Sequence, residues 1–521
     1  MIVVSLPVLA VPMPPLLDYP NHVVRFWLLS GGAQAAPVSR FFAVDWSHTA
    51  TNIGMDAFAA ILGRILPAEI VGRVILGLAG VLPPIGACLV ARRLFGRLTG
   101  WHVLFGLVAW PQVLLTGFMS LQLGLGAALI AVWLDLKLAD QPWQWRLARQ
   151  VGQGLMVLLI HPFGIILYLV LLSGLTVGKS AAVLLDRAAW LALLRRLAMG
   201  CVPAILALGV IGLRLLLFRQ PGEASSGVPE LSWYGVSWAW LGLERVFWSV
   251  ITPYRSYRLD VDLLFFVLLW VPVAIALWRK SLEVHGGLLV AGVLLFLISV
   301  VCPQGIGSTS MVDIRLQTMA ALVLPMAVLP DVRLGKRSGL ILAGFALAVV
   351  AGRSAWLTGI WMQRQADIRS LYATLDQMPI GARLLPTVAV RDPATEPIGR
   401  YLDGLSESYL HQATLAVMRR QAYVPTVFAE SGKQPLRVLP PFDEIHEMSG
   451  GLPVTIDDLQ SGNTGAANFL SDWQDDFDYV LVVNGDEAPV EPEIVPGVCL
   501  VANHGFARLY RIAKAATPCP A

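Results

Sequence analysis

The densest group of polar residues in the apolar part of the sequence is the run from Asp18 through Tyr19, Asn21 and His22 to Arg25. A carboxylate, an imidazole and a guanidinium within two helical turns can serve as a general base, a hydrogen-bond partner and a phosphate clamp. The same residues can also simply begin a helix, with Asp18 or Asn21 as its cap and Arg25 reaching toward the membrane surface. Spacing alone favours neither interpretation.

A second polar group follows within the same stretch of sequence. It comprises Asp45-Trp46-Ser47-His48 and then Asn52-Ile53-Gly54-Met55-Asp56. Asp56 could place a second carboxylate near Asp18, as a further catalytic group or as a metal ligand shared with it, and Asn52 is a candidate for binding substrate. A polar helix face with an N-cap is the structural alternative.

Five further polar residues lie where apolar stretches begin or break: His161, Arg255, Arg258, Asp313 and Arg315. Polar groups are costly at membrane depth, so they are candidates for function by default. An arginine at the start of a helix can extend to the membrane surface, or it can hold a phosphate with two hydrogen bonds beside the helix N-terminus. His161 is either a core histidine or part of the same site.

The elements that must position these residues follow from composition. The chain has 521 residues, of which 56% are hydrophobic and 14% charged, and its mean hydropathy is +0.66. Soluble proteins carry roughly 25% charged residues, so the composition excludes a cytosolic enzyme and predicts a polytopic helical membrane protein. Five cysteines exclude a disulfide scaffold, and a net charge of +3 without a basic run gives no support to nucleic-acid binding.

The charge is divided unevenly along the chain. Residues 1–358 hold 26 Lys+Arg and 15 Asp+Glu, a net of +11, whereas residues 359–521 hold 12 and 20, a net of −8. The first range therefore predicts a transmembrane catalytic domain, and the second predicts a soluble α/β domain. The short β-like runs of the second range are Leu384–Val390, Tyr423–Phe428, Tyr479–Val483, Cys499–Ala502 and Phe506–Ile512, with helices at 364–377 and 405–421. A disulfide between Cys499 and Cys519 is left open.

About 11 membrane spans are predicted, each from an apolar run. They are 1–17, 68–90, 101–118, 121–138, 149–160, 162–177, 197–218, 261–278, 286–302, 316–330 and 339–358. A helix break at His161-Pro162 places all four lysines of this domain on the cytoplasmic side, as cytoplasmic loops prefer. The loop 18–67 and residues 359–521 then lie outside the cytoplasm, and residues 50–66 carry an interfacial amphipathic helix.

This layout resembles the GT-C superfamily of membrane glycosyltransferases over the whole chain. That superfamily has an acidic residue in the first external loop just past the first span, and Asp18 occupies the matching position. The Asp-Tyr-Pro-Asn-His and Asn-Ile-Gly-Met-Asp sequences, with Asp313-x-Arg315, are similar to a branch found in bacterial envelope polysaccharide clusters. The second acidic residue of the loop is either Asp45 or Asp56.

The resemblance implies a bacterial inner-membrane glycosyltransferase of the inverting type. It would take a sugar from a polyprenyl-phosphate donor and transfer it to a glycan or lipid acceptor outside the cytoplasm, with Asp18 as base and His22 beside it. Arg25 and the residues of the helix starts would bind the donor's phosphate. No sequence motif requires a cofactor, and a divalent metal on Asp18 and Asp56 is left open. The alternatives are a polymerase or ligase acting on an undecaprenyl-diphosphate glycan, and a transporter or assembly subunit for lipid-linked sugars.

The positive residues of the loops lead to a prediction of topology. Reporter fusions should place residues 140–148, 180–195 and 334–338 in the cytoplasm and residue 521 outside, because Lys and Arg collect in cytoplasmic loops. Cytoplasmic labelling of residue 521 would contradict this arrangement.

Overall fold

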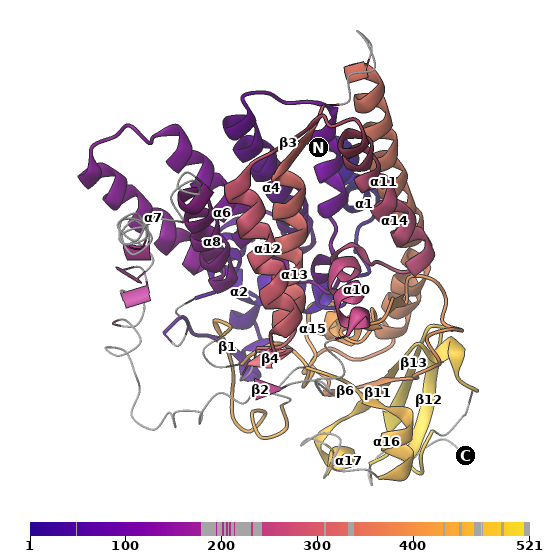
Figure 1. The fold of residues 1–521 in the computed structure, drawn as a ribbon. Helices are drawn as coiled ribbons and strands as arrows, with labels where there is room; N and C mark the ends of the chain where they lie inside the picture. The colour runs from indigo at the N-terminus through magenta and orange to yellow at the C-terminus, as the bar shows by residue number, and fades with distance from the viewer. Residues whose placement is uncertain are drawn as a thin grey trace. The chain divides into compact units, whose positions relative to one another are not determined.

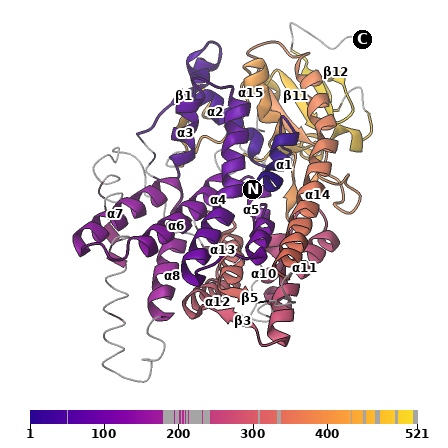
Figure 2. The ribbon, with the colours of Figure 1, turned by 90° about the horizontal axis from the view of Figure 1, so that it is seen from above.

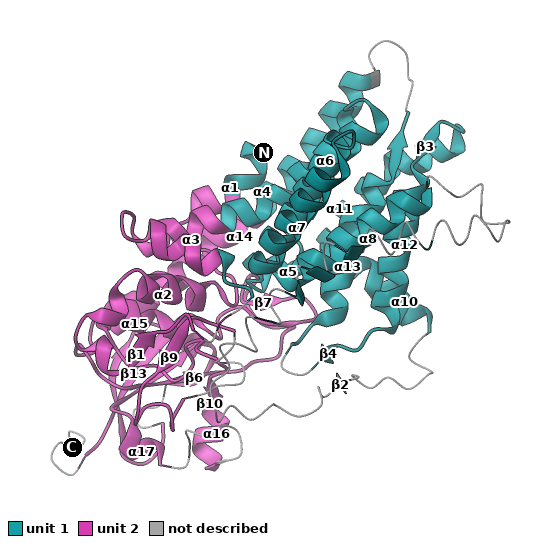
Figure 3. Cartoon of the chain, turned by 90° about the vertical axis from the view of Figure 1, so that its left-hand side faces the viewer, with its two compact units in different colours: residues 1–6, 50–54, 76–356 teal, residues 7–49, 55–75, 357–521 magenta. Residues whose placement is uncertain are grey.

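The computed structural model forms two compact units (Figure 3). Unit 1 comprises residues 1–6, 50–54 and 76–356, and unit 2 comprises residues 7–49, 55–75 and 357–521. The structure describes residues 1–47, 49, 51–178, 242–306, 309–331, 338–430, 433–446, 451–462, 470, 472–490 and 494–514, together with isolated residues between 179 and 241. The predictions for His48, for Cys519 and for most of the span 197–218 lie outside these residues.

Unit 1 is built mainly of apolar helices. Within the described residues, four helices are long and apolar enough to cross a membrane. They are α4 (Ala68–Phe95), α6 (Met119–Lys137), α11 (Leu259–Trp278) and α14 (Ser338–Leu375). Residues 68–75 of α4 and 357–375 of α14 belong to unit 2. The shorter helices α8 (Pro162–Gly178) and α12 (Gly286–Val301) are also apolar. The chain is therefore a helical protein of membrane type, and the number of eleven spans stays a prediction.

The predicted break at His161-Pro162 is confirmed. Helix α7 (Trp143–Ile160) ends there and α8 begins, with His161 in extended backbone conformation. Proline disfavours a helical conformation in the residue before it, and it cannot donate a hydrogen bond to the preceding turn. The His161 side chain accepts a hydrogen bond from Phe163 N at Nδ1, 3.1 Å away, which caps the new helix. Helices α6, α7 and α8 pack against one another (Figure 2).

Two other predicted spans differ in the structure. Helix α1 (Ile2–Ala10) covers only part of 1–17, since the prolines at 12, 14 and 15 interrupt the helical hydrogen bonds. The range 101–118 is not one helix but a 3₁₀ helix, η3 (Gly100–Val108), followed by α5 (Gln112–Leu115). Pro111, in extended conformation, separates them.

The remaining elements of unit 1 are short, apart from helix α13. They are α10 (Leu243–Ile251), η6 (Thr252–Tyr254), α13 (Val312–Met326), and the strand pairs β2 (Leu231–Ser232) with β4 (Gly305–Ile306) and β3 (Leu282–Val284) with β5 (Val328–Pro330). Pairing of β3 with β5 explains why α13 stops at Met326 and does not reach residue 330 as predicted. Helix α12 packs against both α13 and α8 (Figure 1).

Unit 2 contains a five-stranded sheet with the order β10-β6-β11-β13-β12. Figure 1 labels β6, β11, β12 and β13 of this sheet. The strands are β6 (Leu384–Val388), β10 (Val454–Thr455), β11 (Tyr479–Val483), β12 (Val498–Asn503) and β13 (Ala507–Ile512). Strands β10, β6 and β11 are parallel, whereas β13 is antiparallel to β11 and to β12. The predicted α/β character of the carboxy-terminal region is thus confirmed, and four of its five predicted strands are present.

Two local predictions for this region were wrong. Residues 423–428 form an isolated bridge between Tyr423 and Arg383, not a strand. The helix predicted at 405–421 is reduced to α15 (Leu415–Arg420), because β7 (Tyr401–Leu402) and β8 (Ser406–Glu407) form a hairpin with Gly404 at a φ of 63° in its turn.

The first loop of the sequence folds with this region in unit 2. Its elements are α2 (Tyr19–Leu29), η1 (Gly32–Gln34), η2 (Val38–Arg40), β1 (Phe42–Val44) and α3 (Gly54–Leu62). Strand β1 pairs antiparallel with β9 (Leu436–Val438), and α2 packs against η7 (Gln412–Thr414) and α15. The other short elements of the unit are α16 (Ile456–Ser461), α17 (Trp473–Asp476) and η9 (Gly485–Glu487). Cys499 is disulfide-bonded.

Helix α3 has the two faces expected of an interfacial helix. Met55 and Ala59 are buried, whereas Phe58 and Ile61 expose 39% and 68% of their surface. Ile65, just past the helix, exposes 77%. The predicted helix is confirmed, and its exposed apolar side fits a membrane surface.

Close approach of α8 to α12 leads to a prediction for folding. A Cβ atom on Gly174 would lie 2.4 Å from Gly287 O, and one on Gly287 would lie 2.5 Å from Gly174 O. Gly174→Ala should therefore separate the two helices and lower the melting temperature of the purified protein. Gly77→Ala in α4 is the matched control, since a Cβ there meets no atom within 4 Å, and an equal loss in both variants would contradict the packing argument.

Candidate functional site

Asp18 stands at the N-cap position of α2, yet its side chain makes no capping hydrogen bond. Its Oδ1 lies 3.4 Å from Nε2 of His411, and the Asp18 side chain keeps 13% of its surface exposed. The carboxylate is thus turned toward an imidazole and not toward the helix it begins. The capping interpretation of Asp18 is not what the structure adopts.

His411 is a buried residue just before η7, with 3% of its side chain exposed. The edge of its ring meets the Phe428 ring at a centroid distance of 4.9 Å. Burial lowers the pKa of His411 to about 4, so the imidazole is neutral at neutral pH. It therefore faces Asp18 as a dipole and not as a cation.

Asn21 holds this contact in place. Its Nδ2 donates to Thr426 O at 2.8 Å, and its Oδ1 accepts from Phe428 N at 2.8 Å. The side chain is fully buried, so both hydrogen bonds are protected from water. His22, one residue on, packs its ring against Phe26 and Phe428. The Asn21 amide thus fixes residues 426–428 on the helix that Asp18 begins.

Arg25 and Asp56 form a buried ion pair. Arg25 Nε lies 2.9 Å from Asp56 Oδ1, and their side chains are 3% and 1% exposed. Burial raises the pKa of Asp56, and the Arg25 guanidinium opposes that rise. Arg25 therefore does not reach toward the membrane surface, and the pair joins α2 to α3.

A metal shared by Asp18 and Asp56 does not fit these residues. The cation beside Asp56 is Arg25, and Asp18 faces His411. Across the described parts of the chain, no group of three or more His, Cys, Asp or Glu side chains is placed to hold a metal ion.

The Arg315 guanidinium in unit 1 lies close to two aromatic rings. Its Cζ is 4.6 Å from the centre of the Phe118 ring and 5.1 Å from that of Phe163. Phe163 follows the His161 break, so the broken helix pair supplies one of the two rings. Arg315 stands in the first turn of α13, where the helix N-terminus also favours an anion.

The other charged candidates of unit 1 have partners of different kinds. Asp313 is buried and pairs with Arg245 at 2.9 Å. Arg258 pairs with Asp260 on the surface, where both side chains are more than half exposed. Arg255 lies over the Trp248 ring at 4.6 Å. Of the two ion pairs, only the one between Asp313 and Arg245 is buried, so it contributes more to holding the structure in place than the surface pair of Arg258 with Asp260.

Asn52 has a left-handed backbone, with a φ of 60°. Asparagine tolerates this conformation better than most residues. It places Ile53 N within 2.9 Å of Leu159 O, at the end of α7. Asn52 thus shapes the chain beside His161, both within unit 1.

Sequence reasoning missed His411 and Phe428. They contact Asp18 and His22 from nearly four hundred residues away, and no local spacing marks such a contact. The one available signal was a histidine inside a segment predicted as helix.

Comparison with known proteins finds one similar fold. No protein family model matches the chain, and no curated protein sequence matches it. Among solved structures, it is similar to the crystal structure of ArnT from Cupriavidus metallidurans bound to undecaprenyl phosphate, at 13% identity and a TM-score of 0.48 over 100% of this chain and 98% of that one. At this identity the similarity concerns fold alone, and the function proposed below rests on this chain's own residues.

The neutral His411 leads to a prediction for stability. Its pKa is about 4 in the folded chain and roughly 6.5 when unfolded, so the unfolded state binds the extra proton between these values. Stability should therefore fall as the pH falls, by about 2 kcal/mol between about pH 7 and pH 5 from this residue. Melting temperatures of wild type and His411→Gln should converge over that range, and a constant difference would contradict a neutral buried imidazole.

Proposed function

We propose that the chain is a membrane glycosyltransferase of the GT-C type that uses a polyprenyl-phosphate-linked sugar donor and an extracytoplasmic glycan or lipid acceptor. The observation that carries the proposal is the Asp18 carboxylate, partly exposed and held beside a buried neutral imidazole. The resemblance to the superfamily implies that the base is an acidic residue at the start of the first external loop, which is the position of Asp18. The four long apolar helices supply the membrane context that a lipid carrier needs.

Asp18 acts as the general base in this proposal. A hydroxyl is a poor nucleophile at neutral pH, so its proton must leave as its oxygen attacks the anomeric carbon. Asp18 takes that proton, the new glycosidic bond forms, and the bond to the carrier breaks with its electron pair going to the phosphate oxygen. One carboxylate suffices for direct displacement, which inverts the anomeric centre.

The neighbours of Asp18 have positioning roles. His411 limits the orientations of the carboxylate without neutralising it, since the imidazole carries no charge at neutral pH. Asn21 fixes the segment that packs against His411, and the Arg25–Asp56 pair joins the two helices of the loop. Asp56, first considered as a second catalytic carboxylate, is proposed here as part of this support, and His22 as a packing residue beside it.

Arg315 is proposed to bind the phosphate of the carrier. Stacking occupies the faces of a guanidinium, whereas a phosphate binds at its edge through paired N–H groups. Negative charge grows on the leaving phosphate during the reaction, so a fixed cation there lowers the barrier. The Asp313–Arg245 pair would hold the first turn of α13 that carries Arg315, while Arg255, Asn52 and His161 are candidates for further contacts with the donor.

The proposed location is a bacterial inner membrane, with residues 359–521 on the periplasmic side. Its support is the positive charge of the loops between the predicted spans, together with the acidic carboxy-terminal region.

Replacement of the proposed base gives the first functional prediction. Asp18→Asn keeps size and polarity but cannot take a proton, so transfer should fall by roughly 10²–10⁴-fold while folding and donor binding persist. Asp140→Asn, at an exposed position, is the control and should keep wild-type transfer. Transfer assays in detergent with a lipid-linked donor measure this, and full activity of Asp18→Asn would refute the proposed function.

A second functional prediction distinguishes Arg315, the proposed phosphate-binding residue, from Arg258. Arg315→Ala should lower kcat by about 10²-fold, as expected when a group that stabilises transition-state charge is lost, and Arg315→Lys should recover part of it. Arg258→Ala removes a surface pair with Asp260 and should change activity little. Equal effects of the two alanine variants would remove Arg315 from the phosphate site.

A further inference from the structure

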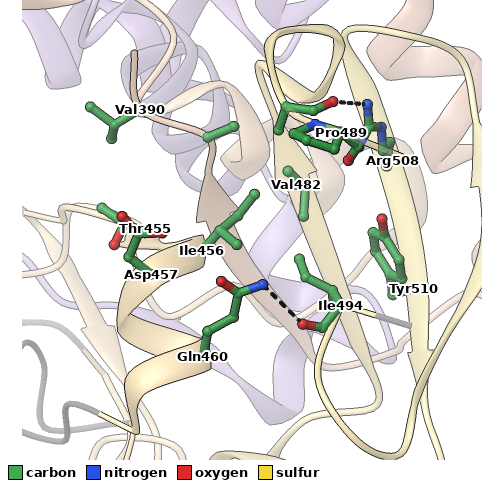
Figure 4. A pocket seen from close by; sticks show the side chains of 12 residues that line it. Val390, Thr455, Ile456, Asp457, Gln460, Val482, Pro489, Ile494, Arg508 and Tyr510 are labelled. Atoms are coloured by element: carbon green, nitrogen blue, oxygen red, sulfur yellow. Dashed lines mark hydrogen bonds between the residues drawn. The ribbon is translucent and has the colours of Figure 1, made fainter. Parts of the chain in front are cut away.

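Unit 2 contains a pocket on one face of its five-stranded sheet, and none of the residues of the proposed reaction lines it. The pocket has a volume of about 380 Å³ and is shown in Figure 4. Strand residues Val482, Arg508 and Tyr510 form one side, and Thr455 and the first turn of α16 form the other. Gln460 Nε2 donates to Ile494 O at 3.3 Å and ties the helix to the loop beside it.

The pocket lies where parallel strands end. Ala389 and Val390 directly follow β6, and Thr455 is the last residue of β10, its parallel neighbour. In open α/β sheets, ligands bind in the crevice outside the carboxyl ends of the parallel strands. The cavity therefore occupies the position that this architecture uses for ligands.

Arg508 gives the pocket a buried positive charge. Its side chain is 3% exposed, and its Nη1 and Nη2 donate to Pro489 O at 2.6 Å and to Ala488 O at 2.7 Å. Both acceptors are neutral carbonyls of residues that line the pocket. Within the described part of the chain, no carboxylate forms an ion pair with Arg508. A buried guanidinium stays charged, and without a counter-charge its burial is unfavourable.

The rest of the lining suits a small organic molecule. Aliphatic residues such as Val390 and Val482 form much of the wall, and Thr455, Gln460 and Tyr510 add hydroxyl and amide groups. A mostly apolar cavity with a few converging polar groups is typical of ligand sites, which span roughly 300–1,000 Å³. This volume lies at the small end of that range, and the hydroxyl and amide groups suit the hydroxyls of a single sugar ring.

We propose that this pocket binds a sugar-sized organic anion, with Arg508 supplying the positive charge that the anionic group faces. The proposal depends on neither Asp18 nor Arg315, so it stands or falls separately from the proposed transfer reaction.

Titration calorimetry on the full chain in detergent tests this site with three probes: glucuronate, glucose 6-phosphate and glucose. At least one of the two anions should bind about tenfold or more tightly than neutral glucose, the scale of one charged interaction. A preference between them identifies the anionic group as carboxylate or phosphate. Equal affinity for glucose, or no binding of either anion at millimolar concentration, would overturn the proposal.

Two variants locate the binding. Val390→Trp fills the pocket from its exposed rim, leaves Arg508 and its two hydrogen bonds in place, and should abolish binding. Arg508→Gln should weaken the anion while leaving glucose unchanged. If Arg508→Gln does not fold, Val390→Trp alone decides, and unchanged anion affinity in that variant would exclude this pocket.

Discussion

The two hydrogen bonds of the buried Asn21 amide are the constraint on which the candidate site in unit 2 depends. They satisfy a carbonyl and an N–H of an irregular segment that no strand or helix pairs, at Thr426 and Phe428. A buried backbone group left without a partner is costly, so loss of this amide would free the segment from α2. Phe428 packs on both His22 and His411, and through it the amide sets where His411 meets Asp18. One side chain thus joins the beginning of the chain to a segment some four hundred residues later.

Features governed by local chemistry could be predicted from the sequence. Proline chemistry at residue 162 and the basic loops located the helix break, and short apolar runs located β6, β11, β12 and β13. Local reasoning failed where a more distant partner competed for the same residues. Residues 405–421 have helical composition, yet a hairpin turn at Gly404 takes the first of them, and pairing of β5 with β3 shortens α13 at its end.

The same distinction between local and distant contacts applies to the candidate site residues. Their types were visible in the sequence, but their pairing was not. Arg25 and Asp56 looked like a phosphate ligand and a second carboxylate, and the structure joins them to each other as a buried pair. Burying an ion pair costs much of what the attraction returns, so such a pair contributes more to fixing geometry than to net stability. His411 could not be recognised from its neighbours in the sequence, because it belongs to the candidate site only through its contact with the distant Asp18.

Burial also determines which charges are suited to act on a substrate. A carboxylate locked in a buried ion pair has its electrostatic interaction already satisfied, and moving it to a substrate would require breaking that pair. Asp18 differs from Asp56 in exposure, because 13% of its side-chain surface stays open against 1% for Asp56. Arg315 and Arg258 differ in their surroundings, since the Arg315 guanidinium lies over two aromatic rings, whereas Arg258 is paired with Asp260 on the surface. Groups that are held in position before the reaction begins are the ones best able to stabilise charge as it develops.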